Sequence, residues 1–161
     1  MFDFQPSTQG DKPALYADLL SAAEAITTGE PDAIANMANL AALIWQYLPD
    51  LNWAGFYRMV DGELLLGPFQ GKPACIRIAL GKGVCGTAAA TAQTQLVTDV
   101  HSFPGHIACD AASAAEIVVP IIVEGGVVAV LDLDSPSFGR FDASDQQGLE
   151  ALIERIGGRL A

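Results

Sequence analysis

Three cysteines lie in the middle of the 161-residue chain, at positions 75, 85 and 109. Cys109 belongs to the segment His101–Asp110, which places two histidines, a cysteine and a carboxylate within ten positions. A long loop inside a compact domain is usually functional or disordered, and the apolar residues of this one favour order. The odd cysteine count, with no export signal at the start, favours reduced thiols over a disulfide framework. These thiols are candidates for nucleophilic or metal chemistry, with simple burial as the alternative.

Local sequence points to Cys85 as the most activated thiol. It follows Gly81-Lys82-Gly83, in the first turn of a short predicted helix. The helix dipole and Lys82 are expected to lower its thiol pKa, although the glycines could serve only a tight turn. Cys75 lies on a predicted strand next to Pro73 and has no comparable activation.

A metal site is another use for the same side chains. His101, His106, Cys109 and a further thiol could supply ligands. The CxxC spacing of structural zinc sites is absent, however, so we expect no metal.

A second group of residues follows from strand periodicity. Trp53 and Tyr57 point to one face of their predicted strand because side chains alternate. Asp132 and Asp134 share one face of an otherwise apolar strand, and Glu116 begins the strand expected to pair with it. Such carboxylates are costly to bury unless water, a partner or a ligand satisfies them, which suggests a binding role. The alternative is that both aspartates lie at a solvent-exposed end of the sheet and bind nothing. Aromatic rings beside carboxylates would suit a small zwitterion.

The elements that must position these residues form an α+β pattern. Helical spacing predicts helices over residues 14–26 and about 31–47, with Ile34 and Trp45 buried in the second. Further elements are predicted as strands at 53–60, 63–67, 74–80, 95–98, 116–123 and 127–135, a short helix at 84–92, and a last helix capped by Asp142 or Ser144. We therefore expect a central antiparallel sheet of about six strands flanked by helices, in a single domain over residues 1–161 with 1–13 as an N-terminal arm.

The charge balance narrows the classes of partner. Lys plus Arg total 8 against 19 Asp plus Glu, a net charge of −11. So acidic a surface repels phosphate backbones and anionic lipids, which argues against nucleic-acid and membrane partners. The longest apolar stretch, residues 117–131, is interrupted by Pro120 and Glu124 and is too short to span a bilayer. With no leader pattern at the start, we expect a cytoplasmic protein.

Four segments of the chain together form a recognisable pattern. They are residues 67–75, 83–88, 99–110 and 131–136, and the third contains Phe-Pro-Gly-His-Ile-Ala-Cys-Asp. This pattern resembles the signature of the free methionine-(R)-sulfoxide reductases, small enzymes of the GAF fold. The likeness runs from the first helix to the last, and it is specific because general GAF domains lack the three cysteines and this loop.

The resemblance implies a role for each cysteine. Cys109 would be the nucleophile that attacks the sulfoxide sulfur, and Cys75 the resolving thiol. Cys85 would be a second partner or a bystander, which conflicts with the local activation argument above. The sulfenic acid on Cys109 would condense to a disulfide, and thioredoxin would reduce it without a bound cofactor.

The resemblance also implies a substrate pocket. Trp53 and Tyr57 would enclose the methyl group and sulfur of free methionine sulfoxide. Glu116, Asp132 and Asp134 would bind its amino group and its sulfoxide oxygen. Because three clustered carboxylates cannot all ionise cheaply, one should keep a proton and donate it. Recognition of an ammonium group predicts a preference for the free amino acid over the protein-bound residue.

Two alternatives belong to other classes of function. A sensory GAF module would bind a small ligand without turnover, but it would not need three thiols. A zinc-binding regulatory domain would carry stoichiometric metal. Oligomeric state stays open, although GAF domains often dimerise through their helices and a homodimer fits the sequence.

Overall fold

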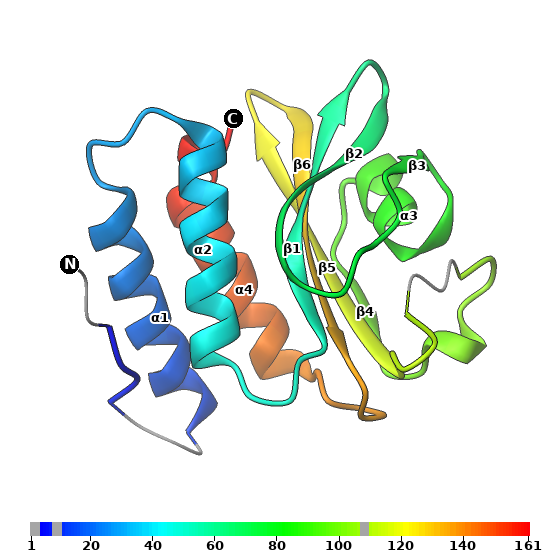
Figure 1. Cartoon of the computed structure of the whole chain (residues 1–161), viewed down its shortest axis with the longest axis horizontal. Coiled ribbons are helices and arrows are strands. Elements are labelled where there is room, and N and C mark those ends of the chain that lie inside the picture. Colours follow the sequence, from blue (N-terminus) through cyan, green and yellow to red (C-terminus); the bar gives the residue numbers. More distant parts are fainter. Residues whose placement is uncertain (1–3, 8–10, 107–109) are drawn as a thin grey trace.

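The structure of the chain is a computed structural model that describes residues 4–7, 11–106 and 110–161. At its centre lies a six-stranded antiparallel sheet with the order β3-β2-β1-β6-β5-β4 (Figure 1). The strands are β1 (Trp53–Val60), β2 (Glu63–Gly71), β3 (Arg77–Ala79), β4 (Gln95–Val97), β5 (Ala115–Val123) and β6 (Gly126–Ser135). The expected α+β class and strand number are confirmed.

Helices cover both faces of this sheet unequally. The longer helices α1 (Lys12–Thr27), α2 (Ala33–Tyr47) and α4 (Ala143–Ile156) pack on one face, and α3 (Gly83–Thr91) lies on the other (Figure 1). Short 3₁₀ turns, η1 (Val100–Ser102) and η2 (Gly157–Arg159), complete the described elements. Among the described residues, no helix is both long and apolar enough to cross a bilayer.

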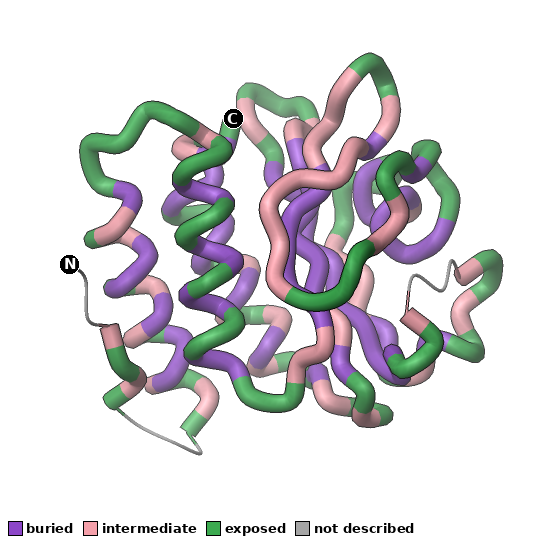
Figure 2. Tube along the Cα trace, in the orientation of Figure 1, coloured by how far each residue is buried: buried purple, intermediate pink, exposed green. Residues whose placement is uncertain are grey.

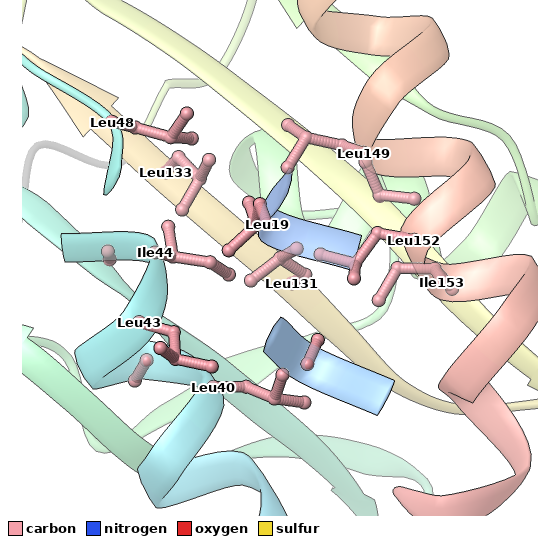
Figure 3. Close-up of a cluster of buried hydrophobic side chains, with 14 of the residues drawn as sticks. Leu19, Leu40, Leu43, Ile44, Leu48, Leu131, Leu133, Leu149, Leu152 and Ile153 are labelled. Carbon is pink, nitrogen blue, oxygen red and sulfur yellow. The ribbon is translucent and has the colours of Figure 1, made fainter. Parts of the chain in front are cut away.

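Strand alternation gives the two faces different chemistry. On β6, Leu131 and Leu133 point toward α1, α2 and α4 and are fully buried there (Figure 3). The residues between and after them, Asp132 and Asp134, therefore face α3. Figure 2 shows that buried positions follow the middle of the sheet and the inner faces of the helices. One face thus carries the main hydrophobic core, and the other carries the acidic residues.

The buried face of α2 differs from the prediction. Ile34 and Trp45 were expected in the core, but they are 42% and 40% exposed. The helix begins at Ala33, with the side chain of Asp32 accepting a hydrogen bond from the backbone N–H of Ala35 at 2.8 Å. Because α2 carries apolar residues nearly all round, its sequence cannot select a face. Packing against the sheet selects the stripe of Met37, Leu40, Ala41, Leu43, Ile44 and Tyr47.

A buried carboxylate joins α1 to α4. Asp145 is 1% exposed and accepts hydrogen bonds from Lys12 Nζ at 2.6 Å, the Tyr16 hydroxyl at 2.8 Å and the backbone N–H of Asp142 at 2.9 Å. Arg140 donates a further bond at 3.2 Å. Asp142 caps the helix, as the sequence predicted, and completes a capping box with Asp145. Four donors compensate the burial of this charge, so the two helices meet in one fixed geometry.

Close contact at the α1–α4 interface generates a stability prediction. A Cβ added at Gly148 would lie 2.2 Å from Tyr16 Cγ, and the Tyr16 hydroxyl is held by Asp145. Gly148→Ala should therefore destabilise the protein by about 1–3 kcal/mol, although alanine favours helices. Urea denaturation measures the change. Gly158→Ala, where a Cβ meets no atom within 4 Å, is the matched control. Equal stability of the two variants would contradict the packing argument.

Candidate active site

A pocket opens on the α3 side of the sheet. It encloses about 540 Å³ of empty space, part of it open to solvent. Its walls come from β1, β5, β6, the start of α3, the connection after β2 and the segment before β5. The residues lining it are Trp53, Tyr57, Lys72, Pro73, Ala74, Ile78, Lys82, Gly83, Val84, Cys85, His106, Asp110, Ser113, Glu116, Asp132 and Asp134.

Sheet register brings the predicted aromatic and acidic residues together. Trp53 of β1 pairs with Asp134 of β6, and Asp134 pairs with Glu116 of β5. These three residues form one row across three strands. Asp132 lies two residues before Asp134 on the same strand face, and Tyr57 lines the same pocket. All five substrate-binding residues predicted from the sequence thus line a single pocket.

Burial controls the protonation of the three carboxyl groups. It raises the pKa of Glu116, Asp132 and Asp134 well above the ordinary value of each. Mutual repulsion adds to this effect, with Asp134 acting on Glu116, Glu116 on Asp132, and Asp132 on Asp134. The pocket therefore holds protonated carboxyl groups at pH values where exposed ones are ionised.

His106 contacts this acidic group from the loop side. Its Nε2 lies 3.5 Å from Glu116 Oε2. Burial lowers the pKa of His106 and raises that of Glu116. These opposite shifts favour a contact between neutral imidazole and neutral carboxylic acid over an ion pair. Sequence reasoning gave His106 no role in the substrate pocket.

Cys85 lies in the pocket, but its environment opposes activation. The side chain is 4% exposed and donates a hydrogen bond to Asp132. Burial raises the thiol pKa well above its ordinary value, and the charges of Asp132 and Glu116 raise it further. The expectation that the helix dipole and Lys82 lower this pKa is wrong. Desolvation and two carboxyl groups from β5 and β6 raise the thiol pKa by more than one helix terminus lowers it.

Trp53 is the centre of an aromatic wall. Its ring stacks on Tyr57 at a centroid distance of 5.8 Å and on Phe69 of β2 at 5.2 Å. Phe69 can approach because the residue beside it on β1 is Gly55, where a Cβ would lie 2.3 Å from Phe69 Cβ. Phe69 was not among the site residues predicted from the sequence. The sequence feature that could have indicated Phe69 is Gly55, a glycine in the middle of an aromatic strand. Such a glycine often marks a position where another residue packs closely against the strand.

Cys75 lies on a connection that these aromatic residues hold in place. Trp53 Nε1 donates to the carbonyl of Lys72 at 3.1 Å, and the Tyr57 hydroxyl donates to the carbonyl of Cys75 at 3.0 Å. The predicted strand 74–80 is reduced to Arg77–Ala79, because a side chain rather than a sheet partner takes the Cys75 carbonyl. Cys75 is half-buried and unbridged.

Two described residues that flank Cys109 in the chain border the same pocket. Residues 107–109, and with them the predicted nucleophile Cys109, lie outside the described residues. Their described neighbours His106 and Asp110 both line the pocket. Asp110 pairs with Lys72 at 3.1 Å and accepts from the backbone N–H of Ala112 at 2.9 Å. His101 is exposed beside Phe138 instead and is not among the residues that line the pocket.

The buried carboxyl group of Asp132 generates a prediction about stability and pH. A carboxyl whose pKa is raised on folding binds its proton more tightly in the folded chain than in the unfolded one. Its contribution to stability is therefore present below about pH 4 and is lost as pH rises toward the folded pKa. Asp132→Asn should be more stable than wild type, by about 1–3 kcal/mol at pH 8 and by less at pH 5.

Urea denaturation at both pH values measures this difference. Asp61→Asn, at an exposed position of the β1–β2 turn with a backbone φ of 52° that asparagine tolerates, is the control. A stability gap that is the same at both pH values would contradict a raised carboxyl pKa.

Comparison with known proteins places this site in a family. The family model of the GAF domain matches residues 34–160. The chain is 52% identical to a free methionine-R-sulfoxide reductase of Escherichia coli, over 91% of this chain and 88% of that protein. It is 44% identical to a free methionine-R-sulfoxide reductase of Saccharomyces cerevisiae, over 93% and 88% of the two chains.

Among solved structures, a close match is the free methionine-R-sulfoxide reductase of Neisseria meningitidis in complex with its substrate. That structure superimposes with a TM-score of 0.95 at 41% sequence identity, over 99% of this chain and 96% of the other. The fold, the matched family model and the identity over nearly whole chains agree. The chain therefore belongs to the GAF-domain family and, within it, to the free methionine-(R)-sulfoxide reductases.

Proposed function

We propose that this protein reduces free methionine (R)-sulfoxide to methionine, with Cys109 as the nucleophile. The observation that carries the proposal is one pocket in which three carboxyl groups of raised pKa, two of them buried and Asp134 half-buried, face an aromatic wall. The relatives named as free methionine-R-sulfoxide reductases support it, as does the neisserial structure with its substrate. The (R) preference comes from the family alone.

The pocket suits both ends of a small zwitterion. The Trp53 and Tyr57 rings would enclose the methyl group and sulfur, since stacked aromatic faces favour apolar and polarisable groups. A carboxylate of the acidic group would pair with the substrate ammonium, which would supply a counter-charge inside the pocket. A methionine sulfoxide inside a polypeptide has no such ammonium.

The first chemical step transfers oxygen from the substrate to the enzyme. The Cys109 thiolate attacks the sulfoxide sulfur while a protonated carboxyl group delivers a proton to the oxygen. The hydroxyl then transfers from the substrate sulfur to the Cys109 sulfur as the bond between the two sulfurs breaks, which leaves methionine and a sulfenic acid on Cys109. Two electrons pass from the thiol to the sulfoxide. The raised pKa of Glu116, Asp132 and Asp134 keeps such a proton donor available near neutral pH.

A second thiol then restores the enzyme. Attack of Cys75 on the sulfenic sulfur forms a Cys75–Cys109 disulfide and releases the oxygen as water. Thioredoxin exchanges its dithiol with this disulfide, which returns two protein thiols and leaves thioredoxin oxidised. Cys75 suits the resolving role better than Cys85, because the high pKa of buried Cys85 disfavours its thiolate. The half-buried Cys75 is also reachable from solvent.

Single cysteine variants test the two steps separately. With enzyme in excess over (R)-sulfoxide, Cys109→Ser should release no methionine, because the first step needs that thiolate. Cys75→Ser should release about one equivalent of methionine per sulfoxide supplied. The same variant should then fail to consume NADPH in a thioredoxin-coupled assay. Chromatographic quantification of methionine gives the first readout, with the (S) diastereomer as the control substrate. Full methionine release by Cys109→Ser would assign the nucleophile elsewhere, and no turnover by the wild type would favour a sensory module.

Blocking the substrate ammonium tests the acidic pocket. N-acetyl-methionine sulfoxide should lose at least about 100-fold in kcat/KM relative to the free amino acid, because it leaves a buried carboxylate unpaired at a cost of about 3 kcal/mol or more. In Asp134→Asn this preference should shrink, since one acidic partner is gone. If the wild type used both compounds equally well, the assignment of the carboxylates to the ammonium would be wrong.

A further inference from the structure

A thiol and two carboxyl groups converge at the inner end of the pocket. One ligand atom each from Cys85, Glu116 and Asp132 lies within 4.8 Å of the other two. They come from three different elements, α3, β5 and β6, and each residue is at most 6% exposed. The sheet and the helix together therefore fix the separation of these atoms.

One oxygen of this cluster receives no hydrogen bond from the described part of the chain. Asp132 Oδ1 is buried and has no hydrogen-bond partner among the described residues. An unsatisfied buried acceptor costs about 1–3 kcal/mol, so such an oxygen in a pocket points to something that binds there. This observation is independent of the spacing of the three ligand atoms.

The donor set favours one class of ligand. A thiolate, carboxylate oxygens and a neighbouring imidazole are the ligands of zinc, which binds them in a tetrahedron at about 2.0–2.3 Å. Such bonds separate ligand atoms by about 3.3–3.8 Å, so the cluster could close around the ion with small side-chain rotations. Calcium and magnesium prefer six or more oxygen ligands, which this cluster does not supply.

We propose that Cys85, Glu116 and Asp132 bind a thiophilic divalent cation of the Zn²⁺ type, and that the bound ion excludes substrate from the pocket. The fourth ligand is water or Nε2 of His106, which lies 3.5 Å from Glu116 Oε2. The first half of the proposal concerns metal binding alone. The second half rests on the proposed function, because that function assigns Glu116 and Asp132 to the substrate.

A variant with Cys85 as its sole cysteine tests the metal site. In Cys75→Ser/Cys109→Ser, titration with Co²⁺ should produce a thiolate-to-metal charge-transfer band, and Zn²⁺ should abolish that band by displacement. Adding Cys85→Ser should remove the band and weaken Zn²⁺ binding by at least about tenfold. Loss of a residue that only supports a metal ligand already weakens metal binding by about that factor, so loss of a ligand should weaken it at least as much. No Co²⁺ band in the folded sole-cysteine variant would overturn the site.

Isosteric variants of the carboxyl groups give a test that leaves the cysteines unchanged. Competition for Zn²⁺ with a chromophoric chelator should show that Asp132→Asn and Glu116→Gln each bind Zn²⁺ at least about tenfold more weakly than wild type. Asp61→Asn, exposed on the β1–β2 turn, is the matched control and should match wild type. Circular dichroism confirms that each variant is folded. If Asp132→Asn bound Zn²⁺ as tightly as Asp61→Asn, the proposal would fail.

Displacement without turnover separates the two halves of the proposal. In the sole-cysteine variant, which cannot complete the reaction, free methionine sulfoxide should displace Co²⁺ and reduce the charge-transfer band. A band that persists at saturating sulfoxide would leave the metal site standing and overturn both the exclusion and the substrate assignment of Glu116 and Asp132. In wild-type assays, Zn²⁺ should raise KM without lowering kcat, and a chelator should reverse this effect.

Discussion

Desolvation of three carboxyl groups on one face of an apolar sheet is the constraint on which the rest of the structure depends. Glu116 and Asp132 are 6% exposed, and burial raises the pKa of both. Groups in this state weaken the folded form at neutral pH. The opposite face of the same strands offsets that cost, because Leu131, Leu133 and their neighbours pack against three helices (Figure 3).

The same burial makes these groups useful for chemistry. An exposed carboxylate has released its proton well below neutral pH, whereas a desolvated one keeps it and can donate it to a developing oxyanion. Asp132 shows both sides of this arrangement, since its Oδ1 has no partner among the described residues while its neighbours raise its pKa. The buried carboxyl group of Asp132 therefore lowers the stability of the folded chain, and binding of a ligand, a proton or a cation there would recover the lost free energy.

The aromatic residues serve the site in two ways. Their faces form the wall of the pocket, and their polar ends hold the connection that carries Cys75. Lys72 on that connection pairs with Asp110, which follows the predicted nucleophile Cys109 in the chain. The two segments assigned to thiol chemistry are therefore linked by an ion pair between described residues. Because Lys72 is largely exposed, this pair contributes little energy.

Local patterns in the sequence determined the presence and chain order of the strands, the cap of α4 and the faces of the sheet. Alternation on β6 placed Asp132 and Asp134 together, Asp61-Gly62 marked a turn that has positive φ at both residues, and Asp142 caps α4. Each of these depends on interactions within a few residues. The role of Cys109 stays a prediction, since that residue lies outside the described part of the chain.

Tertiary structure alone decided the environment of Cys85, the buried face of α2 and the place of Phe69 beside Trp53. Helix position suggested an activated thiol at Cys85, but two carboxyl groups from other strands and the loss of water raise its pKa. Desolvation and long-range contacts depend on which segments the sheet register brings together. No window of neighbouring residues contains that information.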